Sequence, residues 1–226
     1  MGVAIERFPP PGTSSWQLKQ VLERYSVDLV IDVGAHEGEF ARKIRSEAGY
    51  RGRVISFEPH ADSYEALSKR MKSDSLWTGQ QLALGDAPGT MRLLTFEGSA
   101  MNSVFTPNAF GMSTFGSMRP TGSEEVPVQR LDSLVLRGEA LLLKTDTQGY
   151  DLRVLEGATG ILDRVVAIII ELSVKPIYDG TPFWIDTVLR LRTLGFGPAG
   201  LFPISRDPHD LQVIEFDGIF VRDNRE

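Results

Sequence analysis

The sequence contains no cysteine, which excludes disulfide bonds, thiolate metal sites and a cysteine nucleophile. It also lacks long apolar runs, since the longest one, residues 165–170, is far shorter than the roughly 20 residues of a membrane-spanning helix. Residues 1–12 have no apolar segment of the kind that secretory signals contain. These absences predict a cytoplasmic protein without a membrane span.

Positive charge is also scarce. The chain has 24 Lys and Arg against 30 Asp and Glu, so its net charge is −6, and no basic run is longer than a few residues. A groove for nucleic acid usually shows a basic patch. We therefore expect no nucleic-acid partner.

The rest of the composition is that of an ordinary globular chain. With 226 residues, of which 42% are apolar, the chain is long enough to bury one sizeable core. We expect a single domain over residues 1–226. Residues 1–15 are expected to be a loose lead-in, because the prolines at 9–11 cannot enter a helix interior.

Residues 29–38 (LVIDVGAHEG) are the stretch around which the chain is organised. A β-branched apolar run ends in an acid, passes through a glycine-rich turn and continues with helical spacing from Glu39. This pattern predicts a buried strand, a tight loop and a helix whose first N–H groups face a ligand. Taken alone, the stretch is equally consistent with an ordinary strand-to-helix turn.

The glycine spacing indicates which ligand this loop would hold. Dinucleotide-binding loops have the spacing G-x-G-x-x-G, whereas this loop has only Gly34 and Gly38. Asp32 and Glu37 would repel a pyrophosphate, but an acid at the strand end suits the ammonium group of S-adenosylmethionine. The loop therefore favours S-adenosylmethionine, and a nucleotide-dependent oxidoreductase is disfavoured.

Strand patterns alternate with helix patterns along the chain, which is typical of a parallel sheet covered on both faces. Helices are expected at residues 16–25, 37–47, 61–71, 149–157 and 184–194. Strands of the main sheet are expected at residues 28–33, 53–58, 80–84, 141–146, 165–171, 196–203 and 213–221. The short polar loop between the last two predicts an antiparallel strand at the C-terminus. The expected fold class is α/β, with a doubly wound, mostly parallel, seven-stranded Rossmann-like sheet of the class I methyltransferase type.

Residues 98–125 have a different composition from the rest of the chain. They are rich in Gly, Ser, Thr and Pro, yet they contain six large Phe and Met side chains, which disordered linkers usually lack. We expect a lid or substrate loop that packs these side chains over the site, with a flexible insertion as the alternative. The flanking residues 90–96 and 126–129 are expected to form a returning strand and a short edge strand, since Pro127 lacks an N–H group.

Acids follow several of the expected strands, and ligands of open α/β sheets bind beyond the carboxyl ends of the strands. Glu58 is placed to accept both hydroxyls of a ribose, and Asp86 to accept from the amino group of adenine. The expected donor-binding residues are Asp32, Gly34, Ala35, Gly38, Glu58, Leu84, Gly85 and Asp86.

Asp146 and Glu171 end neighbouring strands and are expected to flank the methyl group in transfer. One carboxylate could act as general base for a substrate hydroxyl. Alternatively, the pair could bind Mg²⁺ with help from Asp217 and Gln148, and the metal would then lower the pKa of the hydroxyl. His36 is a rival candidate for the catalytic base.

Taken together, these stretches resemble the FkbM family of S-adenosylmethionine-dependent methyltransferases. The resemblance covers about residues 28–222, and the stretches that carry it are VIDVGAHEGEF, VISFEP, LALGD, VQRLDSL, LLLKTDTQGYDLRVLEGA, IIIELSVKPIYDG, LRTLGF and FDGIFVR. It implies O-methylation of a hydroxyl on a sugar or polyketide-type metabolite. It also implies donor contacts at Asp32, Gly34, Glu58, Pro59 and Asp86, with Asp146 as the active-site acid.

The chain departs from the family pattern at two places, and other functions compete. His36 stands where the family often has Asn, and Thr147-Gln148 where it often has Val-Glu. An N-methyltransferase acting on a macromolecule would usually show an Asn/Asp-Pro-Pro-aromatic loop, which this chain lacks after residue 146. A non-catalytic S-adenosylmethionine-binding module is the third interpretation. We expect a small-molecule or saccharide acceptor, and the sequence leaves the oligomeric state open.

Overall fold

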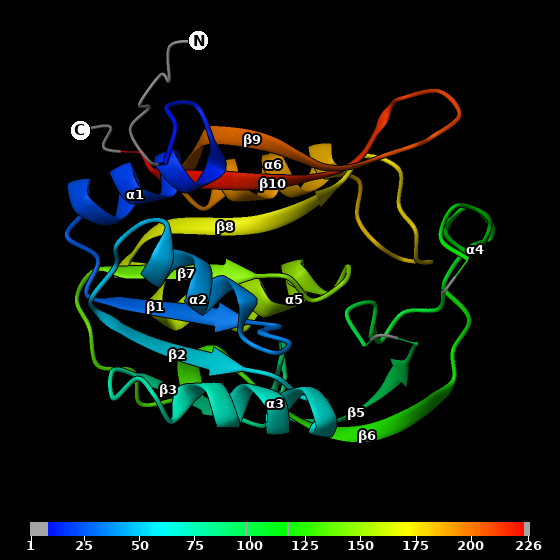
Figure 1. The fold of residues 1–226 in the computed structure, drawn as a ribbon, viewed down its shortest axis with the longest axis horizontal. Coiled ribbons are helices and arrows are strands. Elements are labelled where there is room, and N and C mark those ends of the chain that lie inside the picture. The colour runs from blue at the N-terminus through cyan, green and yellow to red at the C-terminus, as the bar shows by residue number, and fades with distance from the viewer. Residues whose placement is uncertain (1–8, 98, 117, 224–226) are drawn as a thin grey trace, which may run out of the picture.

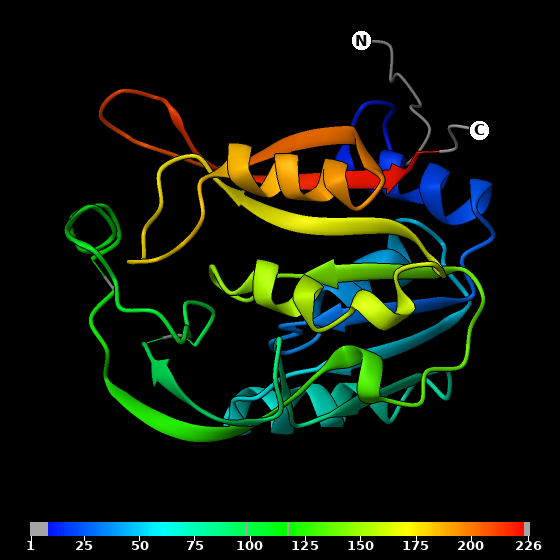
Figure 2. The ribbon, with the colours of Figure 1, turned by 180° about the vertical axis from the view of Figure 1, so that it is seen from behind.

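The structure, a computed structural model, describes residues 9–97, 99–116 and 118–223. It confirms the expected fold class, since a seven-stranded, mostly parallel sheet lies between helices on both of its faces (Figures 1 and 2). The strands of this sheet, in spatial order, are β3 (Trp77–Gln80), β2 (Arg53–Phe57), β1 (Leu29–Val33), β7 (Leu141–Thr145), β8 (Val165–Ser173), β10 (Val213–Arg222) and β9 (Phe196–Arg206).

The strand order reverses beside β1, and this reversal places the site. From β1 the chain runs outward to β2 and β3, and it returns to the other side of β1 with β7. In such sheets the crevice for a ligand lies beyond the carboxyl ends of the two strands at the reversal. β10 pairs antiparallel with both β8 and β9, which confirms the predicted antiparallel C-terminal strand.

The alternation of side chains along β1 explains why both faces of the sheet are covered. Val30 packs in one core with α1 (Ser14–Arg24), α2 (Glu39–Ser46) and α3 (Ala61–Met71). Its neighbours Leu29 and Ile31 pack in the opposite core with α5 (Asp151–Glu156), the short η2 (Thr159–Ile161) and α6 (Trp184–Thr193). A strand that is apolar on both sides requires this double cover.

Helix α1 starts earlier than expected. The side chain of Thr13 accepts a hydrogen bond from the N–H of Trp16, so Thr13 is the N-cap and the helix begins at Ser14. Ser14 and Ser15 therefore belong to the helix rather than to the lead-in. Residues 1–8 of the expected lead-in lie outside the described part of the chain.

The expected strand at residues 80–84 is wrong, because two strands share this region. β3 at Trp77–Gln80 joins the main sheet, where the indole N–H of Trp77 donates to the hydroxyl of Ser56 on β2. β4 (Ala83–Leu84) instead belongs to a second, three-stranded sheet in the order β4-β6-β5. The sequence of β3 has one large apolar residue followed by Thr, Gly and Gln, so its pattern gave no strand signal.

The second sheet confirms the expected returning strand, which is β5 (Gly89–Thr95). The expectation that residues 126–129 form an edge strand is wrong. β6 (Gly122–Gln129) lies in the centre of this sheet, between β4 and β5. Proline is tolerated there because β4 pairs only with Val128 and Gln129 and does not reach Pro127. The short η1 (Leu131–Ser133) follows.

The expected lid region is largely ordered by its own aromatic side chains. It contains the helix α4 (Ala109–Thr114), and bridges tie Ser103 to Leu94 and Pro107 to Tyr178. Its apolar residues form a core with Phe96, Tyr178 and Ile214, and the members from the loop are Met101, Phe105, Phe110, Phe115 and Met118. Gly98 and Ser117 lie outside the described residues. Over the described ranges, none of the helices has the length and apolar character needed to cross a membrane.

Candidate active site

The glycine loop after β1 is held between the ends of β2 and β7. The N–H groups of Gly34 and Ala35 both donate to the carbonyl oxygen of Phe57, at 3.0 and 3.1 Å. Gly34 has a φ of +69°, and a Cβ at this position would lie 1.9 Å from the backbone oxygen of Asp146. Only glycine allows this close approach, so the loop lies tightly against β7 and leaves space beyond the strand ends.

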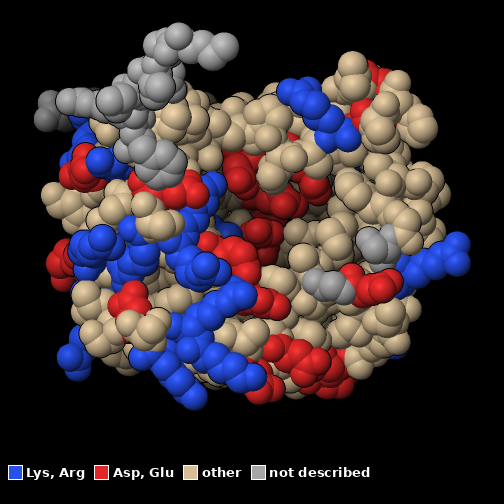
Figure 3. Space-filling model, viewed as in Figure 1, with Lys and Arg blue, Asp and Glu red and all other residues tan. Residues whose placement is uncertain are grey.

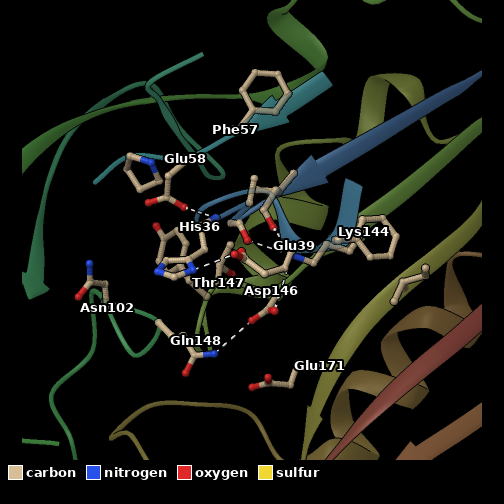
Figure 4. Close-up of a pocket in the computed structure, with 18 of the residues that line it drawn as sticks. His36, Glu39, Phe57, Glu58, Asn102, Lys144, Asp146, Thr147, Gln148 and Glu171 are labelled. Carbon is tan, nitrogen blue, oxygen red and sulfur yellow. Dashed lines mark hydrogen bonds and ion pairs between the residues drawn. The ribbon is translucent and has the colours of Figure 1, made fainter. Parts of the chain in front are cut away.

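Glu58 closes one side of that space. Its side chain is only 6% exposed, and its two oxygens accept the backbone N–H groups of His36 at 2.8 Å and His60 at 2.9 Å. Burial raises the pKa of Glu58, and the two N–H donors oppose that shift. The carboxylate therefore connects the glycine loop to the end of β2, where it faces the cavity (Figure 4).

The cavity has a volume of about 540 Å³ and lies at the carboxyl ends of the strands. Figure 3 shows a hollow with acidic side chains in the middle of this face. The expected site residues that line it are Gly34, Ala35, His36, Glu58, Pro59, Leu84, Asp146, Glu171 and Asp217. In Figure 4, Asp146 lies between Glu58 on one side and Glu171 on the other. The structure thus brings five of the nine expected donor-binding residues and all three candidate catalytic residues to one cavity.

Four expected donor residues lie outside the cavity lining. Gly38 has a φ of +89° and caps α2, where a Cβ would lie 2.5 Å from the ring of Trp77. Gly85 lies beside Tyr150 and Val128. The carboxylate of Asp86 pairs with Arg153 at 2.9 Å, since β4 leads the chain away from the main sheet. The fourth residue, Asp32, is completely buried within β1.

A buried lysine explains the position of Asp32. Lys144 on β7 lies in register with Asp32, and its Nζ is 3.2 Å from Asp32 Oδ1 and 3.6 Å from Asp146 Oδ2. Burial alone would lower the pKa of Lys144, but the charges of Asp32 and Asp146 raise it above its usual value. Lys144 therefore holds its proton more strongly than a free lysine does, and Asp32 positions it rather than reaching the cavity.

The side of the cavity formed by β8 and β10 is rich in carboxyl groups. Glu171, Glu215 and Asp217 line it together with Asp146. Burial raises the pKa of Glu171 well above its usual value, and the charges of Asp146 and Glu215 add to the shift. Burial also raises the pKa of Asp217, with a further contribution from Asp146. These groups therefore hold protons to a higher pH than free carboxylic acids do.

We expect Glu171→Gln to stabilise the protein more at pH 8 than at pH 5. The pKa of Glu171 is higher in the folded protein than in the unfolded chain, so its protonation favours folding. This contribution to the free energy of unfolding is complete below the ordinary glutamate pKa of 4.5 and is lost as the pH rises toward the pKa of the folded state. Glutamine imitates the protonated form, so it avoids a loss of about 1.4 kcal/mol per pH unit between the two pKa values. Thermal unfolding at both pH values measures the effect, and an equal gain at the two would contradict it.

The expected Mg²⁺ site does not fit the structure. Across residues 9–97, 99–116 and 118–223, no three His, Asp or Glu side chains are grouped so that they could hold a metal ion. Glu171 instead lies close enough to Glu215 for each to affect the pKa of the other, and Asp146 faces the ammonium group of Lys144. Asp146, Glu171 and Asp217 thus line one cavity without forming a ligand set, and we assign no step to a metal.

The loop after β5 covers part of the cavity. Ser99, Met101 and Asn102 line it, and the hydroxyl of Ser99 lies 2.7 Å from Nε2 of His36. The hydroxyl of Tyr178 donates to the carbonyl oxygen of Met101 at 2.7 Å, which ties the loop to the segment after β8. His36 therefore contacts the covering loop.

The family model of the methyltransferase FkbM domain matches residues 32–197. This chain belongs to the FkbM methyltransferase family. A curated protein of similar sequence, the hexuronic acid methyltransferase AglP of Haloferax volcanii, is 28% identical over 150 residues, which cover 64% of this chain and 56% of AglP. The chain thus spans little more than half the length of that relative.

Solved structures of low sequence identity share this fold. An FkbM methyltransferase from Methylobacillus flagellatus KT aligns with a TM-score of 0.53 and 16% identity, over 86% of this chain and 43% of that chain. An S-adenosylmethionine-dependent methyltransferase from Clostridium acetobutylicum aligns with a TM-score of 0.51 and 6% identity, over 93% and 91%. An rRNA methylase from Streptococcus thermophilus reaches 0.50 at 14% identity, over 98% and 100%. The class I methyltransferase fold is therefore confirmed, but it does not select the acceptor.

Three site residues of this FkbM-family chain were not predicted. Lys144 had a signal, because a lysine inside the apolar run of a buried strand needs a carboxylate partner, and Asp32 occupies the neighbouring strand. Glu215 was missed although it lies only two residues before Asp217, on the strand that was expected to reach Glu171. Ser99 reaches His36 only through the tertiary path of its loop.

Proposed function

We propose that this FkbM-family chain is an S-adenosylmethionine-dependent O-methyltransferase that acts on a hydroxyl of a sugar-like small molecule. The observation that carries the proposal is that Glu58 and Asp146, which follow β2 and β7, line one cavity of about 540 Å³. Family membership supports methyl transfer, and the name of AglP supports a saccharide acceptor.

The Glu58 side of the cavity fits the donor. Each oxygen of Glu58 accepts one backbone N–H, and since a carboxylate has about four lone-pair sites, it can also accept the ribose hydroxyls. Leu84, Met91 and Leu93 supply an apolar wall for adenine. The sulfonium of the bound donor supplies an activated methyl group, so the protein mainly has to align the acceptor and exclude water.

Asp146 is the residue placed to take the proton of the acceptor hydroxyl. Its Oδ1 accepts from Nε2 of Gln148 at 3.1 Å, its Oδ2 faces Lys144, and its side chain is 41% exposed. These contacts orient the carboxylate and leave it accessible to a substrate. In its protonated form, Glu171 can donate a hydrogen bond to a second hydroxyl of the acceptor, which would position a polyol such as a sugar.

The carboxyl groups around Asp146 lead to a prediction about acceptor charge. Asp146 would repel a carboxylate on the acceptor, as would Glu171, Glu215 and Asp217 once they lose their protons, and Lys144 is already paired with Asp32. We expect a neutral hexoside to be methylated with a kcat/KM at least about tenfold higher than that of the matching hexuronide, since one such repulsion costs about 1.4 kcal/mol or more. A hexuronide that reacts as well as the neutral sugar would contradict this prediction. It would instead indicate a hexuronic acid acceptor, as in the name of AglP.

The test of the function is methyl transfer itself. The protein is incubated with S-adenosylmethionine and a panel of mono- and disaccharides, and formation of S-adenosylhomocysteine and of a methyl ether is followed by mass spectrometry. Donor binding without turnover on any hydroxyl or amine acceptor would favour the binding-module interpretation. A methylamine as the main product would favour the N-methyltransferase instead.

A further inference from the structure

A basic groove lies beside the cavity, although the whole chain carries a net charge of −6. It runs between α2 and the turn that follows α3 and has a volume of about 840 Å³. Five cationic and three carboxylate side chains line it, namely Arg42, Lys43, Arg45, Arg51 and Arg70 against Glu39, Glu47 and Asp74. Figure 3 shows Lys and Arg gathered on this part of the surface, next to the acidic hollow.

The three carboxylates of the basic groove are already engaged. Asp74 pairs with Arg45 at 2.8 Å, Glu39 pairs with Arg70 at 2.7 Å, and Glu47 accepts the hydroxyl of Ser15.

Three cations of the groove remain available. Within the part of the chain that the structure describes, Arg42, Lys43 and Arg51 have no carboxylate within 4.0 Å. Arg42 and Arg51 are also exposed. With five cations against three carboxylates in its lining, the groove keeps a net positive charge.

Lys43 joins the basic groove to the cavity. It lines both, and its ammonium group lies 3.4 Å from the hydroxyl of Ser14. Its charge also opposes the rise in the pKa of Asp217 that burial causes. The groove and the cavity thus adjoin at Glu39 and Lys43 of α2, and from there the groove runs toward Arg51, which precedes β2.

We propose that the basic groove binds the diphosphate of a nucleoside diphosphate sugar whose sugar ring occupies the cavity. Guanidinium groups such as Arg42 and Arg51 recognise phosphate oxygens in pairs, and Lys43 would neutralise the phosphate nearest the sugar. A lipid carrier fits less well, because Leu76 is the one exposed apolar side chain in the described lining of the groove. The inference rests on the proposed function, since it takes the sugar of that acceptor as the part that enters the cavity.

The test measures binding of uridine diphosphate by calorimetry, independently of any turnover. We expect Arg42→Glu and Arg51→Glu each to weaken binding at least about tenfold, since each replaces an attraction by a repulsion. The matched control is Arg190→Glu, the same charge reversal at an exposed position of α6, on the opposite face of the sheet. Affinity for S-adenosylhomocysteine should stay the same in all three variants, which shows that they fold.

Several outcomes would overturn the inference without affecting the proposed function. One is that the wild-type protein does not bind uridine diphosphate, and another is that Arg42→Glu binds it as well as the wild type does. A third is that single-stranded RNA or anionic vesicles bind in an Arg42-dependent manner while uridine diphosphate does not. Failure of the proposed function is a separate result, namely no affinity for S-adenosylhomocysteine or no transfer to either a free or a nucleotide-linked sugar.

Discussion

Glu58→Ala is expected to weaken binding of S-adenosylhomocysteine by about 100-fold, which corresponds to about 2.7 kcal/mol. The substitution removes the proposed acceptor of the ribose hydroxyls. It also leaves the N–H groups of His36 and His60 without the carboxylate that now accepts them. Unpaired buried donors cost about 1–3 kcal/mol each, so the glycine loop should also lose order. Titration calorimetry with S-adenosylhomocysteine measures the effect directly.

Two further variants separate donor recognition from loop disorder. Glu58→Gln keeps one acceptor oxygen, so it should bind the donor product more tightly than the alanine variant does. Glu65→Ala removes an exposed glutamate of α3 that pairs with Lys69, and it should bind like the wild type. If Glu58→Ala binds the donor product normally while its thermal stability is unchanged, the cavity beside Glu58 is not the donor site.

Asp146→Asn is expected to lower kcat by about 10²- to 10⁴-fold, the usual contribution of a positioned general base. Asparagine keeps the shape of the side chain and its contact with Gln148, but it cannot take the proton of a hydroxyl. Affinity for S-adenosylhomocysteine should change by no more than about threefold, because the residue faces the acceptor side of the cavity. Steady-state kinetics with an acceptor found in the saccharide panel, together with calorimetry, provide both numbers.

The control for this prediction is a variant of His36, the rival candidate for the catalytic base. The ring of His36 contacts Ser99, on the loop after β5, and Glu39. We therefore expect His36→Gln to change KM, or the order of that loop, more than it changes kcat. If Asp146→Asn retains most of its activity and His36→Gln does not, the base is the histidine. Loss of donor binding in Asp146→Asn would instead show that this carboxylate holds the donor.

Local pattern was sufficient for much of the fold. Apolar residues on both sides of residues 29–33 require helices on both faces, and Gly34 permits the close turn against β7, so the central unit follows from neighbours in the chain. The short polar link before residue 213 similarly predicts the antiparallel strand. β3 was missed because its position depends on Trp77 reaching Ser56, a contact between residues 21 positions apart.

The residues of the site also differ in whether the local sequence could predict them. Glu58 and Asp146 could be predicted because strand ends of a parallel sheet meet at one edge, which is a consequence of local pattern alone. The proximity of Glu171 to Glu215 and the basic groove beside an acidic cavity could not. Charge balance and burial depend on which strands and helices become neighbours in space, and side chains distant in the chain acquire their roles only through that packing.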